Sequence, residues 1–253
     1  MRQFLLVLLI VAIAVVSSVA QTKAEKITSE EYIEANELSR HFFAVFADTM
    51  DIKSLIKDFG TSDFYDCVEH GDAPFVRSNQ AEKMSMVQRR RFYIAETNFL
   101  MAIFMWGTNS PGSTGGFSFK MLPTQVKTIL TKQTFDAMVK NDSSDANLSD
   151  AETRKYINSL LPKLERSIPI FRNRVKNAGG RNSRGFRDAM RFFEFESTIA
   201  DYLFRPELKT ESKSCGSVSV GGRVLYADIP FFQIQMVKVN GRLKVHQLVF
   251  HVD

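Results

Sequence analysis

The sequence predicts an α+β protein that is predominantly α-helical and ends in an antiparallel β-hairpin or meander packed on the helices. Three observations predict this class. Apolar residues recur at three- and four-residue intervals through residues 29–204, which is the spacing of one helix face. Residues 231–250 instead alternate between apolar and polar side chains around Asn240-Gly241, as two paired strands do. The 22 phenylalanines, many of them at helical spacing, supply a large apolar core.

Residues 1–20 have the three parts of a secretory signal peptide. Arg2 supplies the positive charge, an apolar run extends from Phe4 to Val16, and Ser18-Val19-Ala20 offers the small residues that signal peptidase needs. The run is shorter than the about 20 apolar residues of a membrane-spanning helix. We therefore expect cleavage after Ala20, a secreted or periplasmic protein, and no transmembrane segment after cleavage. Retention of the segment as a membrane anchor is the alternative.

Residues 21–253 are expected to form a single α+β domain, with a helical part over about 27–205 and a β part over about 216–252. The first helix has a clear start, because Thr28 and Glu31 match a capping box. Further helices are predicted at 52–59, ended by Gly60; at 80–106, ended by Gly107; at 123–140, opened by Pro123; at 149–178, ended by Gly179-Gly180; and at 184–204, closed by Pro206. Pro162 and Pro169 are expected to kink or break the fourth of these, since each removes a backbone donor.

The C-terminal hairpin has a predicted register. Asn240-Gly241 favours a two-residue type I′ turn, which places Val239 opposite Arg242. Counting back from the turn gives the remaining pairs: Lys238 with Leu243, Met236 with Val245, Ile234 with Gln247, and Phe232 with Val249. In this register His246 lies on the polar face of the sheet. Residues 218–229 are expected to supply one or two further strands.

Cys67 and Cys215 are the only cysteines. In an oxidising compartment a disulfide between them is the expected state, and closing so long a loop contributes about 5 kcal/mol in the chain-entropy model. Two free buried thiols are the alternative.

The densest cluster of side chains that could act as acids, bases or ligands lies in the string DFYDCVEHG. It contains Asp63, Asp66, Cys67, Glu69 and His70, and His41 of the first helix could approach it. Zinc sites need three or four ligands at fixed spacing, which this string does not supply, so no metal site is predicted. A solvated loop that contributes one half of a disulfide explains the same residues.

A basic run between Lys163 and Arg191 is the most suggestive surface feature. Its candidate anion-binding residues are Arg172, Arg174, Lys176, Arg181 and Arg184, to which Arg89-Arg90-Arg91 could add. Such a surface could bind an anionic component of the cell envelope, whereas nucleic acid is an unlikely partner for a secreted chain. The alternative is that these cations pair with acids elsewhere, since the whole chain carries a net charge of only +5.

The functional expectation is a secreted or periplasmic non-enzymatic globular domain that acts by binding. None of the G-x-S-x-G, S-x-x-K or H-E-x-x-H catalytic motifs occurs, and no cofactor is expected. The alternative is an envelope hydrolase or a metal- or ligand-binding enzyme that uses the cluster from Asp63 to His70. A structural or assembly role would instead require an exposed apolar patch on one helix.

Overall fold

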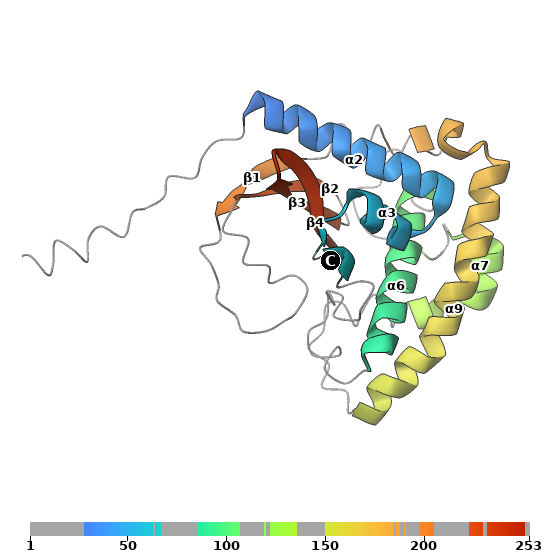
Figure 1. Cartoon of the computed structure of the whole chain (residues 1–253). Coiled ribbons are helices and arrows are strands. Elements are labelled where there is room, and N and C mark those ends of the chain that lie inside the picture. Colours follow the sequence, from blue (N-terminus) through green and yellow to red (C-terminus); the bar gives the residue numbers. More distant parts are fainter. Residues whose placement is uncertain are drawn as a thin grey trace, which may run out of the picture.

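The computed structural model describes residues 28–62, 64–66, 85–106, 119, 122–135, 150–184, 186–187, 190, 198–204, 223–229 and 232–250. Its helices and strands follow one another as α2 (Ser29–Thr49), α3 (Ile52–Phe59), α6 (Met86–Trp106), α7 (Thr124–Ile129), α9 (Asp150–Asn177), the 3-10 turn η2 (Gly180–Asn182), β1 (Thr198–Phe204), β2 (Arg223–Ile229), β3 (Phe232–Val239) and β4 (Arg242–Phe250) (Figure 1). The predicted α+β class is confirmed. No helix in these ranges has a stretch long and apolar enough to cross a membrane.

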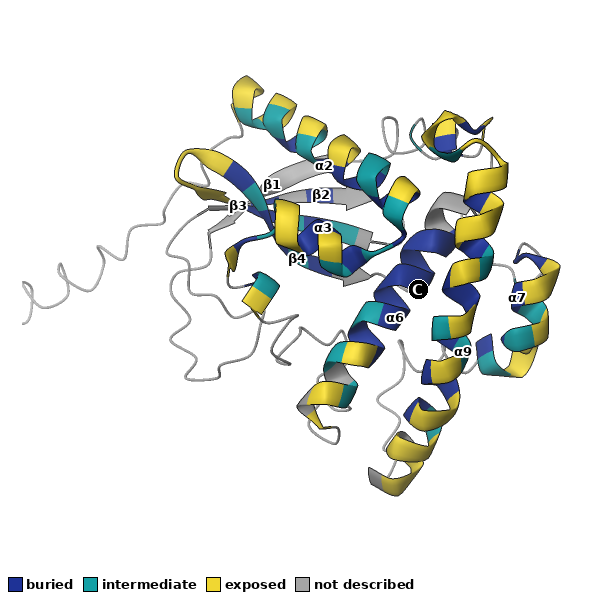
Figure 2. Cartoon of the chain, turned by 45° about the vertical axis from the view of Figure 1, so that its right-hand side comes forward, coloured by how far each residue is buried: buried dark blue, intermediate teal, exposed yellow. Residues whose placement is uncertain are grey.

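The four strands form one antiparallel sheet in the order β1-β2-β3-β4. Helix α2 contacts β1, β2 and β4, and α6 packs along α9 (Figure 1). The buried surfaces of these elements face one another, while the outer sides of α2 and α9 are exposed (Figure 2). The core therefore lies between the sheet and the helices, with phenylalanines such as Phe42, Phe46 and Phe99 fully buried in it.

The predicted capping box of the first helix and the predicted range of the second are confirmed. The N–H of Glu31 donates to the Thr28 hydroxyl at 3.2 Å, and the N–H of Thr28 donates to the Glu31 carboxylate at 3.0 Å. Helix α3 has the predicted bounds, with Asp51 as its N-cap and Gly60 at its C-cap. The buried side chain of Asn98 on α6 accepts the N–H of Ile52 at 2.8 Å. This bond ties the first turn of α3 to the central helix.

Helices α6 and α7 differ from the predicted ranges. Helix α6 begins at Met86, not at Gln80, because the hydroxyl of the non-helical Ser85 accepts the N–H of Gln88 at 3.3 Å and caps the helix there. Helix α7 ends at Ile129, so the prediction of one helix to Lys140 is wrong. A new turn starts at Thr131, whose hydroxyl accepts the N–H of Thr134 at 3.3 Å. Each polar side chain offers the backbone a partner that competes with helix continuation.

The two prolines of α9 do not break it. The helix runs through Pro162 and Pro169 for 28 residues. Both prolines are exposed, on the side away from the apolar residues that pack inward, such as Leu164 and Phe171. The carbonyl groups that lose their helical donors therefore face water, and the packed apolar side holds the axis.

The prediction of a last helix reaching Phe204 is wrong, because Thr198–Phe204 forms strand β1, antiparallel to β2. The segment TIADYLF is rich in β-branched and aromatic residues, which suit a strand. Phe192 and Phe195, which carried the helical spacing, lie outside the described residues. Pairing with β2 overrides the local pattern.

The predicted turn is confirmed, with Asn240 at φ 51° and Gly241 at φ 80°. The register is as predicted from Val239↔Arg242 to Met236↔Val245. A bulge then shifts it, giving Ile234↔Leu248 and Phe232↔Phe250, so the two outer predicted pairs are wrong. His246 is the extra residue, and it is buried instead of lying on the polar face.

Candidate anion-binding face

The structure does not assemble the predicted cluster within its described part. Asp63, Cys67, Glu69, His70 and Cys215 lie outside the described residues. Asp66 is exposed in the helical turn 64–66, and His41 is exposed on α2 with its ring 5.2 Å from that of Phe59. Among the described residues, no group of three or more His, Cys, Asp or Glu side chains could hold a metal ion.

Sequence reasoning missed the role of His246. Its Nδ1 atom lies 3.3 Å from the hydroxyl of Thr61, and the N–H of Thr61 donates to the carbonyl of Val245 at 2.9 Å. The Thr61 hydroxyl also accepts the N–H of Phe64 at 3.1 Å and so caps the turn that follows. Both side chains of the pair are less than a tenth exposed. The pair therefore fixes the start of this turn to the sheet, and only the bulge brings His246 inward to make it.

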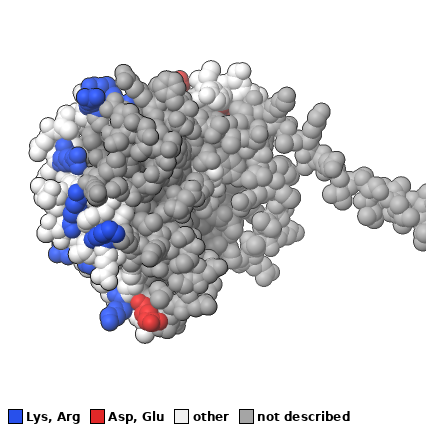
Figure 3. Space-filling model, turned by 180° about the vertical axis from the view of Figure 1, so that it is seen from behind, with Lys and Arg blue, Asp and Glu red and all other residues white. Residues whose placement is uncertain are grey.

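Exposed basic side chains are distributed along the outer side of α9. We call this side the basic face of α9 and define it by the exposed residues Arg154, Lys155, Arg166, Arg172, Arg174 and Lys176. Seen from behind, Lys and Arg side chains form a column along one edge of the molecule, with an acidic side chain at its lower end (Figure 3). Glu165 is the one acid in the sequence between Thr153 and Asn177.

The packing of α9 explains why these cations point outward. Leu160, Leu164, Phe171 and Val175 are buried toward α6, and the rings of Phe99 and Phe171 meet edge-on at 6.1 Å. A helix with one apolar stripe leaves the rest of its circumference to solvent. At 1.5 Å per residue the helix is about 42 Å long. Its positive charge is thus spread along a line comparable to the width of a small domain.

The negative charge of Glu165 does not reduce the positive charge of this face, because an arginine of the neighbouring helix α6 pairs with the Glu165 carboxylate. Arg91 of α6 binds the carboxylate through two atoms, with Nε–Oε1 at 2.5 Å and Nη2–Oε2 at 2.7 Å. This hydrogen bonding raises the pKa of Arg91, which stays charged. Close by, the side-chain amide of Gln88 donates to Asn158 at 2.9 Å. The start of α6 is therefore fastened to the middle of α9.

The five cations predicted from the sequence have different surroundings. Arg172, Arg174 and Lys176 are exposed, and among the described residues no acid pairs with them. Arg181 is bound to Asp48 of α2, and this hydrogen bond raises its pKa. Arg184 is exposed just after η2. The pairing alternative thus holds for Arg181, which joins η2 to α2, but not for the three cations at the end of α9.

Arg154 and Lys155 extend the face beyond the predicted run. They lie in the second turn of α9, both exposed, but the run considered from the sequence began only at Lys163. The signal that could have found them is the continuity of the helix through both prolines. A helix expected to break at Pro162 gives no reason to group residues on its two sides.

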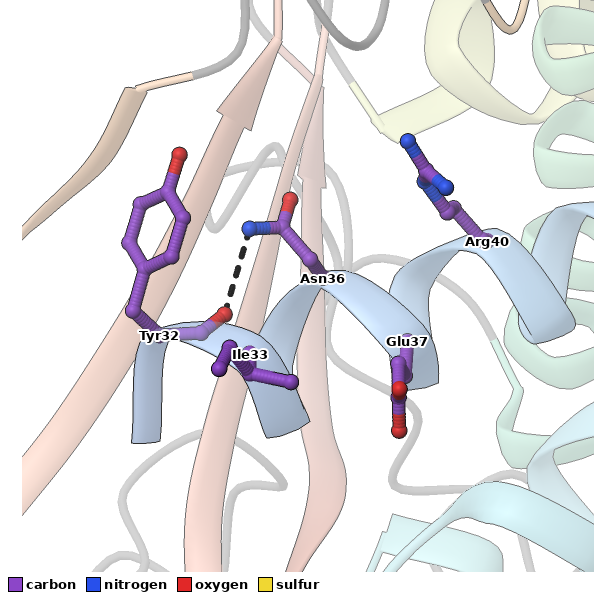
Figure 4. A pocket seen from close by; sticks show the side chains of 5 residues that line it. All are labelled: Tyr32, Ile33, Asn36, Glu37 and Arg40. Atoms are coloured by element: carbon purple, nitrogen blue, oxygen red, sulfur yellow. Dashed lines mark hydrogen bonds between the residues drawn. The ribbon is translucent and has the colours of Figure 1, made fainter. Parts of the chain in front are cut away.

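A hollow lies on α2, but its side chains do not converge on one chemistry. It is lined by Tyr32, Ile33, Asn36, Glu37 and Arg40 and has a volume of about 360 Å³ (Figure 4). The amide of Asn36 is already bonded to the carbonyl of Tyr32 at 3.1 Å, and Glu37 points away from Arg40. Tyr32 and Ile33 are about half exposed, at 49% and 56%.

Comparisons with protein-family models, with curated proteins and with solved structures found no match.

Proposed function

We propose that this protein is a secreted or periplasmic, non-enzymatic binding protein that holds an anionic component of the cell envelope on the basic face of α9. The observation that carries the proposal is the row of exposed cations along one uninterrupted helix, in which Arg91 compensates the one intervening acid. The positive electrostatic field of such a row of cations attracts polyanions. The N-terminal pattern of residues 1–20 supports export.

The basic residues at the end of α9 also serve the helix itself. Arg174 and Lys176 lie in its last turn, where a positive charge stabilises the negative end of the helix dipole. That effect is confined to the last turn, so it does not account for Arg154, Lys155 and Arg166 farther along the helix. The extent of the charge along the helix is what favours binding over stabilisation alone.

Heparin-affinity chromatography with a salt gradient tests the proposal. We expect the wild-type protein to elute well above physiological salt, and the variant Arg172→Glu, Arg174→Glu, Lys176→Glu to elute early, because each lost contact lowers the salt dependence of binding. The matched control reverses three exposed cations on α3 and the hairpin: Lys57→Glu, Lys238→Glu and Arg242→Glu. It has the same net charge as the first variant and should elute near the wild type.

Two results would count against this function. If both triple variants lose retention equally, heparin responds to net charge and α9 has no special role. If the wild-type protein elutes at low salt, no polyanion is bound at all. The hydrolase alternative stays a prediction, since most of the cluster from Asp63 to His70 lies outside the described residues.

A further inference from the structure

The cations of the basic face of α9 are not evenly spread. An N-terminal pair, Arg154 and Lys155, and a C-terminal group, Arg172, Arg174 and Lys176, lie on either side of a central stretch that contains Arg166. Arg154 and Arg172 are separated by five turns of a helix with 3.6 residues per turn, so they project on the same side, roughly 27 Å apart. On this side the two cationic ends are Arg154 and the pair Arg172 and Lys176, because Arg174, two residues on from Arg172, projects to another side of the helix.

The central stretch lies between the two ends and contains Lys163, Arg166 and the one acid of this part of the helix, Glu165. Glu165 falls between the two ends on that side, and Arg91 engages both of its carboxylate oxygens. The Arg91 side chain is 60% exposed and the Glu165 side chain 34%, so this ion pair itself forms part of the surface. An anionic chain that follows the line from one end to the other would meet no uncompensated acid.

The separation of the ends determines which anions can use both. It exceeds the Debye length of about 8 Å at physiological ionic strength, so a small anion bound at one end does not experience the other. A polymer that reaches both ends makes its second contact as an intramolecular event, and its affinity rises without any new kind of contact. The face therefore favours ligands that are long enough to reach both ends, and not only ligands that are negatively charged.

A membrane surface fits this face less well than a polymer. Helices that bind bilayers place apolar side chains into the lipid beside their cations. The apolar side of α9 is buried against α6, and the large exposed apolar residues of the described chain lie on other elements: Tyr32 and Ile33 on α2, Val87 on α6 and Val239 on β3. The outer side of α9 therefore presents cations without large exposed apolar side chains beside them.

From these observations we infer that the basic face of α9 is a two-ended track for a linear anionic polymer that carries repeated oxyanion groups and spans from Arg154 to Lys176. This inference rests on the proposed function, since it names the shape of the ligand that the face would hold. Arginine, which forms most of the track, suits such a ligand because its planar group can bind two oxygens of one phosphate or carboxylate.

Binding of polyphosphate of graded length to the purified full chain tests the track. Affinities for tripolyphosphate, medium-chain and long-chain polyphosphate are compared per phosphate, which removes the trivial gain from having more binding positions on a longer chain. We expect a rise on the order of 100-fold per phosphate once the chain spans both ends. The variant Arg154→Glu, Lys155→Glu should bind tripolyphosphate like the wild type but lose this rise.

The outcomes separate the inference from the function beneath it. If affinity per phosphate is flat with length, or if Arg154→Glu, Lys155→Glu keeps the rise, the two-ended track is overturned while retention on heparin still supports a binding function. If vesicles containing phosphatidylglycerol bind more tightly than long-chain polyphosphate, the face serves a bilayer and the inference also fails. Loss of heparin retention in the wild type would overturn both.

Discussion

The Nδ1 atom of His246 lies 3.3 Å from the hydroxyl oxygen of Thr61, and both side chains are buried although 185 positions separate them in the chain. The contact depends on two local features, the bulge that turns His246 inward and the capping geometry that fixes Thr61. The contact joins the segment just after α3 to strand β4. Thr61 thereby makes four hydrogen bonds, to Phe64, Tyr65, Val245 and His246.

Replacing Thr61 by valine should lower the free energy of unfolding by about 1 to 3 kcal/mol. Valine keeps the shape but leaves the N–H of Phe64 and the ring nitrogen of His246 without this buried hydroxyl. Urea denaturation measures the change. Thr61→Ser keeps the hydroxyl and is the control, expected within about 1 kcal/mol of the wild type. Equal stabilities of the two variants would show that the hydroxyl contributes nothing.

Glu34 covers part of the outer edge of strand β4. Its carboxylate accepts the N–H of Leu243 at 2.7 Å, and β4 stands at the end of the strand order. Unpaired groups on such a strand invite pairing with another chain. We expect Glu34→Ala to lose about 1 to 3 kcal/mol, with faster hydrogen exchange at the amide of Leu243. Glu34→Gln retains an acceptor oxygen and should keep most of the protection, and fast exchange in both variants would mean that a side-chain oxygen is not enough.

The exposed prolines of α9 should be replaceable with a gain in stability. Proline costs about 3 kcal/mol relative to alanine within a helix, while its effect on the unfolded chain returns up to about 1 kcal/mol. Pro162→Ala and Pro169→Ala are therefore each expected to stabilise by about 1 to 2 kcal/mol, with helix content by circular dichroism unchanged. Ser159→Ala, at another exposed position of α9, should shift stability by at most about 0.5 kcal/mol. A loss of stability in both proline variants would show that the rings make contacts that alanine cannot.

Burial of Tyr93 should make stability fall at alkaline pH. Desolvation, aided by the nearby Glu96 carboxylate, raises the pKa of Tyr93 above its ordinary value of about 10. Above that pH the unfolded chain releases the phenolic proton while the folded chain keeps it, so this group lowers the free energy of unfolding by about 1.4 kcal/mol per pH unit. Denaturation at a series of pH values above 10 should show a shallower decline for Tyr93→Phe. Tyr32→Phe, at a half-exposed position, should decline like the wild type, and parallel curves for all three proteins would contradict the assignment.

Local signals predicted the parts of the fold that short-range chemistry determines. The capping box of Thr28 and Glu31, the end of α3 at Gly60 and the turn at Asn240-Gly241 are each fixed by bonds or dihedral angles within a few residues. The failures arose where a distant partner decides. Thr198–Phe204 fits a helical or a strand pattern, and only β2 selects the strand. His246 fits the alternation of a strand, and the bulge opposite Met236 moves it to the other face.

The candidate face was predictable only in part, for the same reason. The excess of Arg and Lys after Lys163 is visible in the sequence. The sequence does not show which of these cations have an acidic partner. Arg181 pairs with Asp48 across 133 positions of the chain, and Arg91 pairs with Glu165 across 74. Ion pairs between different helices depend on how the helices pack, and the spacing of charges along the chain does not predict them. The continuity of α9 through two prolines, which groups Arg154 with Arg172, also comes from packing.

The hydrogen bonds of Glu34 with Leu243 and of Thr61 with His246 affect how the protein folds. Helix α2 packs on strands β2 and β4 as well as on α3 and α9, and its bond to β4 spans 209 positions of the chain. Contacts between residues so far apart in the sequence close large loops, which costs chain entropy before the contacts form. This slows folding, and the apolar faces of the helices stay exposed in the meantime. Removing strand β4 would therefore take away one of the surfaces on which α2 packs, in addition to the strand's own pairing with β3.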